Sequence, residues 1–284
     1  MTACGKAILN GEHFVLYGAP ALAIPLPACR LRLVPGRSTA PGDLLPAWQR
    51  AREALGLPPT GDLPFRVESD LPTASGLGSS AALSVALVRL AARQSGRDPS
   101  PAEVARAARE VEHLFHGTSS GLDPAVVAWE APILWTPGGE PEVLPWSRPD
   151  LEVVLAVAPG SRSTAEAVRR VQDHAANHPE AFAGFLRTSR ALTEAWADRL
   201  RRGRTPEGAF LREAQAMLRA MGLSSPAIEA LVETMEAAGA IGAKITGAGI
   251  AGAVLALGHR DRVDAIVEAA RHAGATRVFR AGLA

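Results

Sequence analysis

The sequence predicts a two-domain α/β fold, and three observations predict it. The chain has 284 residues, which is enough for one very large domain or two of ordinary size. Its first part alternates apolar residues as strands do and continues with helical periodicity, whereas a different order of strands and helices begins at Leu151. We therefore predict an N-terminal mixed α/β domain at 1–155 and a C-terminal domain at 156–284.

Strands open the N-terminal domain. Apolar residues alternate in KAILNGEHFVLYG, residues 6–18, and again in CRLRLV, residues 29–34. Residues 36–64 are rich in Pro and Gly around a short helical piece near Trp48, so we expect an excursion from the sheet there.

Two helices are expected next. Residues 79–95 are apolar on nearly every face, which predicts a helix that is buried on all sides and stopped by Gly96. Ser100, Pro101 and Glu103 form the start signal of a second helix, because they supply a cap, a proline in the first turn and the reciprocal glutamate of a capping box.

The C-terminal domain follows a recognisable order of elements. We expect strands at 151–157, 243–246, 251–257 and 276–283, helices from Ser163 with Glu166 and at 261–274, and two or three more helices within 180–239. Without this helical insertion the order is β-α-β-β-α-β, which is typical of ferredoxin-like domains.

Composition excludes several classes of protein. The formal net charge of +1 lacks the basic excess of a nucleic-acid-binding protein. Two cysteines cannot form a disulfide framework, and no basic, apolar leader pattern opens the chain, so we expect a cytoplasmic protein. The uncharged run 71–88 contains a Gly/Ser turn and a proline, which indicates a buried loop and helix and no membrane association.

The stretch PTASGLGSSAA, residues 72–82, is a small-residue turn that runs into an apolar helix. Such a junction binds phosphate, because glycines allow close approach and the first N–H groups of the helix point outward with the positive end of its dipole. The residues expected to hold the phosphates are Gly76, Leu77, Gly78, Ser79 and Ser80. The alternative is a glycine-rich turn that merely caps a core helix.

Candidates for the other parts of a phosphoryl-transfer site lie on both sides of this turn. Glu112 sits in the last turn of the second helix as a candidate Mg²⁺ ligand, with a solvated glutamate or a pair with Arg109 as the alternative. Asp123 lies in the turn SGLDPAV, where it either accepts a hydroxyl proton or bonds its own backbone. Lys6 and Lys244 are the two lysines of a chain that otherwise uses arginine, and Lys6 could balance the Asp123 carboxylate.

Together these segments resemble the GHMP kinase superfamily and, within it, the mevalonate kinases. The stretches that carry the resemblance fall in family order: GKAILNGEHFVLYGAPALA (5–23), GLGSSAA (76–82), EHLFHGTSSGLDPAV (112–126), RSTAEAV (162–168) and KITGAGIAGAVLAL (244–257). The resemblance implies a two-domain GHMP kinase fold, with an N-terminal mixed lobe, a C-terminal ferredoxin-like lobe and the active site in the cleft between them.

The resemblance also implies residue roles. Asp123 is the catalytic base or hydroxyl-orienting group, and Lys6 assists it. Ser80 and Glu112 hold Mg²⁺, and residues 76–80 hold the phosphates of ATP. The residues implied to line the substrate are Glu12, His13, Thr246 and Gly247. The expected reaction is ATP-dependent phosphorylation of the primary hydroxyl of mevalonate, giving 5-phosphomevalonate for isoprenoid synthesis, and a homodimer is compatible with the family.

The chain departs from the family pattern in a few places. Cys4 replaces the proline usual before Gly-Lys, and Pro124 follows the aspartate where asparagine is common. Ile250 and Ala251 interrupt the run of glycines in the C-terminal motif, so side chains could narrow the approach to the backbone there.

Two rival functions stay open on the sequence. One is another GHMP kinase that acts on phosphomevalonate or a related small hydroxy acid, and the other is a nucleotide-binding member of the fold without catalytic activity.

Overall fold

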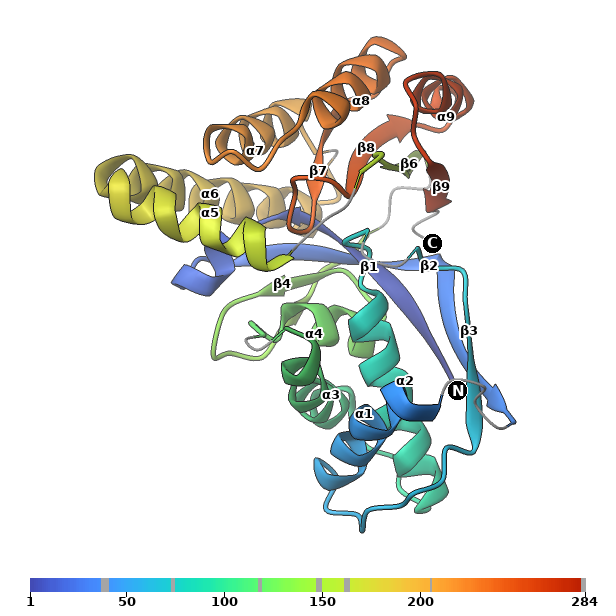
Figure 1. Ribbon diagram of the computed structural model, residues 1–284. Helices are drawn as coiled ribbons and strands as arrows, with labels where there is room; N and C mark the ends of the chain where they lie inside the picture. Colours follow the sequence, from blue (N-terminus) through green and yellow to red (C-terminus); the bar gives the residue numbers. More distant parts are fainter. Residues whose placement is uncertain are drawn as a thin grey trace. The chain divides into compact units, whose positions relative to one another are not determined.

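The computed structural model describes residues 1–36, 41–72, 75–116, 119–146, 150–160, 164–204 and 206–281 (Figure 1). Two compact units make up the chain, and the chain passes between them more than once. Unit 1 contains Met1–Lys6, Pro25–Pro72 and Gly78–Ala131, and unit 2 contains Ala7–Ile24, Thr73–Leu77 and Pro132–Ala284. The division of the sequence at residue 155 stays a prediction.

Four helices pack together in unit 1 (Figure 1). They are α1 (Pro41–Glu53), α2 (Ser79–Gln94), α3 (Pro101–His116) and α4 (Leu122–Trp129). Most of α2 is buried, as its apolar sequence predicts, and its C-terminal end is followed by Gly96 with φ 70°. The capping box at the start of α3 is confirmed, since Ser100 N–H donates to Glu103 and Glu103 N–H donates to the Ser100 hydroxyl.

Unit 1 contains the first residues of β1 (Thr2–Asn10), which lies beside β2, and an antiparallel pair of strands. The later part of β2 (Ala21–Pro35) pairs with β3 (Phe65–Ser69), with Leu31 opposite Ser69. Trp48 of α1 lies edge-on to Phe65 of β3, with ring centroids 5.5 Å apart. The excursion predicted for residues 36–64 therefore contains a helix that packs on the strand that follows it, and residues 37–40 of it lie outside the described part.

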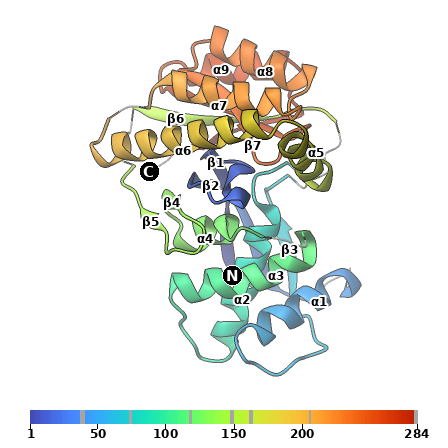
Figure 2. The ribbon, with the colours of Figure 1, turned by 90° about the vertical axis from the view of Figure 1, so that its left-hand side faces the viewer.

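A four-stranded antiparallel sheet is the centre of unit 2. Its strands are β6 (Leu151–Val157), β7 (Gly242–Thr246), β8 (Ala253–His259) and β9 (Arg277–Ala281), in the order β7-β8-β6-β9. The helices of unit 2 are α5 (Thr164–Asn177), α6 (Pro179–Arg201), α7 (Gly208–Ala220), α8 (Pro226–Ala237) and α9 (Val263–His272). Helices α7, α8 and α9 pack on the sheet, and Figure 2 shows them on one side of it. The predicted β-α-β-β-α-β order with its helical insertion is confirmed.

The predicted strand over residues 6–18 is too long. Strand β1 (Thr2–Asn10) ends before Gly11, which has φ 102°, and a 3₁₀ turn, η1 (Phe14–Tyr17), follows. A Cβ atom at Gly11 would lie 2.6 Å from Ala21, so the chain turns here at a position that requires glycine. The apolar residues after Gly11 form the 3₁₀ turn η1 and no strand. Their alternation in the sequence does not distinguish these two structures.

Two short strands in unit 2 were not anticipated. β4 (Ile133–Trp135) pairs antiparallel with the start of β2, and β5 (Glu142–Val143) pairs with β4. Within the described residues, no helix has the length and apolar character needed to cross a lipid bilayer.

Candidate active site

A lysine and an aspartate form an ion pair in unit 1. Lys6 Nζ lies 2.8 Å from Asp123 Oδ2, and the side chains are 3% and 33% exposed. Asp123 belongs to the first turn of α4, so the prediction that it lies in a turn before the next element is wrong. The helix begins at Leu122 and tolerates Pro124, because a residue without an N–H loses no hydrogen bond in a first helical turn.

Glu112 of α3 is the second buried carboxylate of unit 1. Its side chain accepts a hydrogen bond from Ser119 Oγ at 2.8 Å and one from Ser80 Oγ at 3.4 Å, and the residue is 2% exposed. A solvated glutamate is thereby excluded, and Arg109 donates to the Ser119 carbonyl at 3.1 Å instead.

The protonation of Glu112 is strongly perturbed. Burial, followed by the negative charge of Asp123, raises the pKa of Glu112 to about 7, against the lowering effects of Ser119, Lys6 and Ser80. The carboxylates of Glu112 and Asp123 thus share the ammonium group of Lys6. When both carboxylates are ionised, the three side chains carry a net negative charge.

The donor set of this cluster fits a magnesium ion. Mg²⁺ typically takes one or two carboxylates, while waters and substrate phosphates complete its shell. Glu112 and the Ser80 hydroxyl are hard oxygen ligands, and a divalent cation would favour the ionised form of Glu112, which burial and the charge of Asp123 disfavour. The described residues hold no cluster of three or more His, Cys, Asp or Glu side chains suited to a metal.

The start of α2 supplies backbone donors beside this cluster. Gly78 has φ 81°, and the helix that it precedes has no side-chain cap at this end. The N–H groups of the first turn, which includes Ser79 and Ser80, therefore point outward with the positive end of the helix dipole. A Cβ atom at Gly78 would lie 2.7 Å from Lys6 Cγ, so only glycine lets the loop pack against the lysine.

The first half of the predicted phosphate loop belongs to unit 2. Gly76 has φ 89°, and Leu77 N–H donates to Ser75 Oγ at 3.4 Å. The Ser75 carbonyl accepts a hydrogen bond from Ala253 N–H at 3.0 Å, which ties the loop to the beginning of β8.

Glu12 and His13 lie in the turn between β1 and η1, in unit 2. Glu12 forms an ion pair with Lys244 of β7, and both side chains are buried. His13 has φ 61°, and its Nε2 lies 3.0 Å from the Ala248 carbonyl, which fixes Nε2 as the hydrogen-bond donor.

Thr246 is the last residue of β7 in unit 2, and Gly247 follows the strand. The Thr246 hydroxyl accepts a hydrogen bond from Ile8 N–H at 2.8 Å and is 3.2 Å from the Ile8 carbonyl, to which it donates. Thr246 therefore ties β7 to β1, and Gly247 follows with φ 85°.

The two departures in the C-terminal glycine motif are accommodated locally. Ile250 has φ 68°, a costly conformation for a β-branched residue, and its N–H donates to the Leu223 carbonyl. Ala251 N–H donates to the Gly249 carbonyl at 2.9 Å. The motif thus keeps its turn without the full run of glycines.

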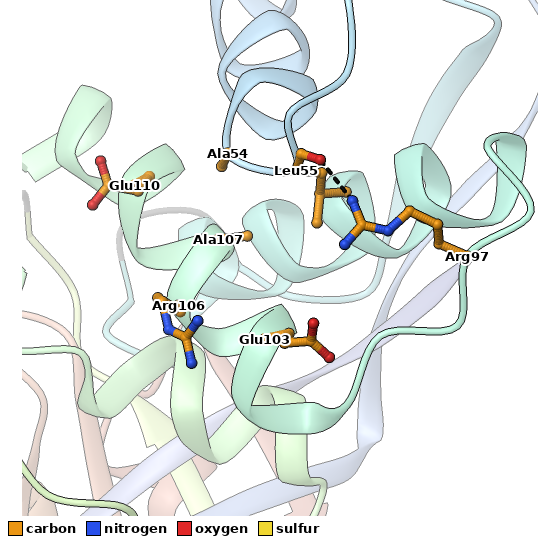
Figure 3. A pocket seen from close by; sticks show the side chains of 7 residues that line it. All are labelled: Ala54, Leu55, Arg97, Glu103, Arg106, Ala107 and Glu110. Carbon is orange, nitrogen blue, oxygen red and sulfur yellow. Dashed lines mark hydrogen bonds between the residues drawn. The ribbon is translucent and has the colours of Figure 1, made fainter.

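None of the predicted site residues lines the two pockets described in unit 1. The smaller pocket, of about 290 Å³, lies beside α3 and is lined by Ala54, Leu55, Arg97, Glu103, Arg106, Ala107 and Glu110 (Figure 3). Two of its charged groups have protein partners, because Arg97 donates to the Leu55 carbonyl and Glu110 pairs with Arg50.

Sequence reasoning missed two residues of the candidate site. Ser119, which donates a hydrogen bond to Glu112, was given no role. Lys244 was singled out because lysine is rare in this chain, but its partner Glu12 was not predicted. The scarcity of lysine was the available signal for Lys244, since both lysines of the chain pair with buried or half-buried carboxylates.

Comparison with known proteins supports a kinase. Residues 44–130 match the family model described as GHMP kinases N terminal domain, and residues 200–276 match the GHMP kinases C terminal model. A mevalonate kinase of Methanothermobacter thermautotrophicus is 31% identical over 272 residues, which cover 90% of this chain and 88% of that protein.

Solved structures of similar fold point in the same direction. The crystal structure of L. major mevalonate kinase in complex with R-mevalonate matches with a TM-score of 0.80 and 26% identity, covering 98% of this chain and 94% of that one. The Methanococcus jannaschii mevalonate kinase matches with a TM-score of 0.83 at 18% identity, over 100% and 98% of the two chains, and shows the shared fold.

Proposed function

Since this chain belongs to the mevalonate kinase family of the GHMP kinases, we propose that it transfers the γ-phosphoryl group of ATP to the primary hydroxyl of mevalonate. The product is 5-phosphomevalonate, an intermediate of isoprenoid synthesis, and the second product is ADP. The use of ATP follows from the family, and the assignment of residues to roles is our proposal.

The observation that carries the proposal is the cluster of Lys6, Asp123, Glu112 and Ser80 at the start of α2. Phosphoryl transfer needs a group that receives or orients the hydroxyl proton, a cation near the transferred group and a phosphate cradle. Within unit 1, an ion pair, a buried carboxylate and an uncapped helix start are adjacent and share contacts. A protein that only binds a nucleotide needs no such combination.

We assign the proton step to Asp123. Its carboxylate accepts the proton of the attacking C5 hydroxyl, the new P–O bond forms at that oxygen, and the bond between the γ-phosphorus and the bridging oxygen of ADP breaks. Lys6, held 2.8 Å from Asp123, fixes the position of this carboxylate and offsets negative charge on the transferred group.

Residues around α2 hold the nucleotide in this proposal. Backbone N–H groups of residues 76–80 bind the phosphates, and Glu112 with Ser80 holds Mg²⁺. The ion supplies charge neutralisation for the phosphates when it is bound. On the substrate side, the residues that line the mevalonate site in this proposal are Glu12, His13, Thr246 and Gly247. The Thr246 hydroxyl also accepts a hydrogen bond from Ile8 N–H.

The test is coupled ADP release by the purified protein with Mg²⁺ and ATP. We expect turnover that depends on mevalonate, and much lower turnover on phosphomevalonate. Preference for phosphomevalonate would transfer the assignment to that substrate, and ATP binding without turnover on any small alcohol would favour a purely nucleotide-binding protein. Glu110→Gln should keep full activity, because Glu110 lies on the same helix as Glu112 but pairs with Arg50. It serves as the matched control for substitutions of Glu112.

A cytoplasmic location and a homodimer complete the proposal. Both cysteines are free and buried, as is usual in a reducing compartment. Cell fractionation tests the location, and sedimentation equilibrium tests the oligomeric state.

A further inference from the structure

Strand β7 presents two different faces. Ala243 and Ile245 join the apolar core of unit 2, where α7 and α8 pack on the strand. Because side chains alternate along a strand, Lys244 and Thr246 project from the other face. There they contact β1 and the turn that follows it: Thr246 bonds to the backbone of Ile8 in β1, and Lys244 bonds to Glu12 in the turn.

The Lys244–Glu12 pair is buried completely. The side chains are 0% and 2% exposed, and Lys244 Nζ also donates to the Ile245 carbonyl. Removing two charges from water costs several kcal/mol per ion, and well-packed apolar residues of similar volume are often as stabilising. Stability alone therefore does not account for an ion pair at this place.

The backbone that carries Glu12 is strained and held on both sides. Gly11 has φ 102°, with no room for a Cβ atom, and His13 has φ 61°. Phe14 N–H donates to the Glu12 carbonyl at 2.7 Å, and His13 Nε2 is bonded to the Ala248 carbonyl. Strained turns that are locked by several contacts gather at binding sites, where a side chain must have one orientation.

We propose that Lys244 is a positioning residue, which holds the Glu12 carboxylate in one orientation, aimed at a hydroxyl group of the substrate. This inference rests on the proposed function. A carboxylate accepts hydrogen bonds and repels a second carboxylate, so Glu12 recognises a hydroxyl of mevalonate and not its acid group. A lysine suits the task because an ammonium is a compact charge that fits beneath one carboxylate oxygen, whereas a guanidinium fork would not.

Kinetics of two single variants and their double variant test the proposal. Lys244→Met keeps the volume but removes the charge, so we expect KM for mevalonate to rise by about 10- to 100-fold, the cost of unpairing a charged hydrogen-bonding group. Dissociation constants for ATP should stay within about twofold. When Glu12 is already Gln, adding Lys244→Met should change KM by less than about threefold. If Lys244 acts only through Glu12, the effects of the two substitutions on KM are not additive.

Gln215→Met is the matched control. Gln215 is buried and accepts a hydrogen bond from Ile245 N–H at 2.9 Å, so its loss disturbs β7 without touching Glu12. We expect this variant to lose stability but to keep the KM for mevalonate. An equal rise of KM in Gln215→Met would mean that Lys244 only supports the strand, and the proposal would be overturned.

A second measurement does not depend on the folding of any Lys244 variant. The chain has two lysines, Lys6 and Lys244, so ¹³Cε-lysine labelling gives two side-chain signals in the NMR spectrum of the wild-type protein. We expect the Lys244 signal to shift on saturation with mevalonate, and not to shift in Glu12→Gln at the same mevalonate concentration. A Lys244 signal whose chemical shift does not change when mevalonate is bound would overturn the proposal.

The outcomes separate this inference from the proposed function. Wild-type turnover on mevalonate with an unchanged KM in folded Lys244→Met overturns the role of Lys244 alone. A wild-type protein that neither binds nor phosphorylates mevalonate overturns the proposed function, and the role of Lys244 with it.

Discussion

Glu112→Gln is expected to stabilise the metal-free protein above neutral pH. Burial and the charge of Asp123 raise the pKa of Glu112 from 4.5 to about 7, so the folded state keeps a proton that the unfolded chain releases earlier. This protonation favours folding fully below pH 4.5, and the contribution is lost as the pH rises through 7. The difference corresponds to about 3 kcal/mol at pH 8.5.

Glutamine is neutral at every pH and avoids this loss. Its amide can serve the Ser119 and Ser80 hydroxyls, but the exchange of a carboxylate for an amide costs about 1 kcal/mol in hydrogen bonding at all pH values. The net gain of the variant at pH 8.5 is therefore about 2 kcal/mol, while at pH 5 the variant should match the wild type or be slightly less stable.

The assay is urea unfolding in the presence of EDTA at pH 5 and pH 8.5. We expect the free energy of unfolding of Glu112→Gln, relative to wild type, to rise by about 2 to 3 kcal/mol between the two pH values. Glu110→Gln, whose side chain is 41% exposed, should show no comparable rise. A difference between Glu112→Gln and wild type that is the same at both pH values would refute the reasoning.

Three further predictions concern the same unit. Asp123→Asn should lower kcat by about 10²- to 10⁴-fold in the ADP-release assay, with the dissociation constant for ATP unchanged; a kcat within threefold of wild type would remove Asp123 from the proton step. Gly78→Ala forces a Cβ atom to 2.7 Å from Lys6 Cγ, so thermal unfolding should show a larger loss of stability, by about 1 to 3 kcal/mol, than in Gly96→Ala, where the added atom meets open space. Burial raises the pKa of Cys4 to about 11, so this thiol should react with a disulfide reagent only after unfolding, and fast reaction of the native protein would contradict the buried position.

Local signals in the sequence predicted most of the secondary structure. The capping box of Ser100 and Glu103 marks the start of α3 because both partners lie within one turn of the chain. The strand and helix order of unit 2 follows from apolar periodicity, which needs no knowledge of distant residues. The predicted extent of β1 was wrong because the turn at Gly11 depends on contact with Ala21. The periodicity of apolar residues does not show a contact between positions so far apart in the sequence.

The candidate site was only partly predictable for the same physical reason. Residue types and the resemblance pointed to Lys6, Glu112 and Asp123, and the structure brings these three together. The pairing of Lys244 with Glu12 joins residues 232 positions apart in the sequence, and no local pattern predicts such a contact. The start of α4 was misplaced because a proline reads as a turn signal, although it is well tolerated in a first helical turn.

The most direct test of the central claim is ³¹P NMR of a reaction with the purified protein, Mg²⁺, ATP and mevalonate. We predict a phosphomonoester signal that couples to the C5 protons of mevalonate, grows in step with ADP and is nearly absent with Asp123→Asn. ATP consumption that yields only inorganic phosphate, or a phosphoester formed equally well by Asp123→Asn, would contradict this prediction.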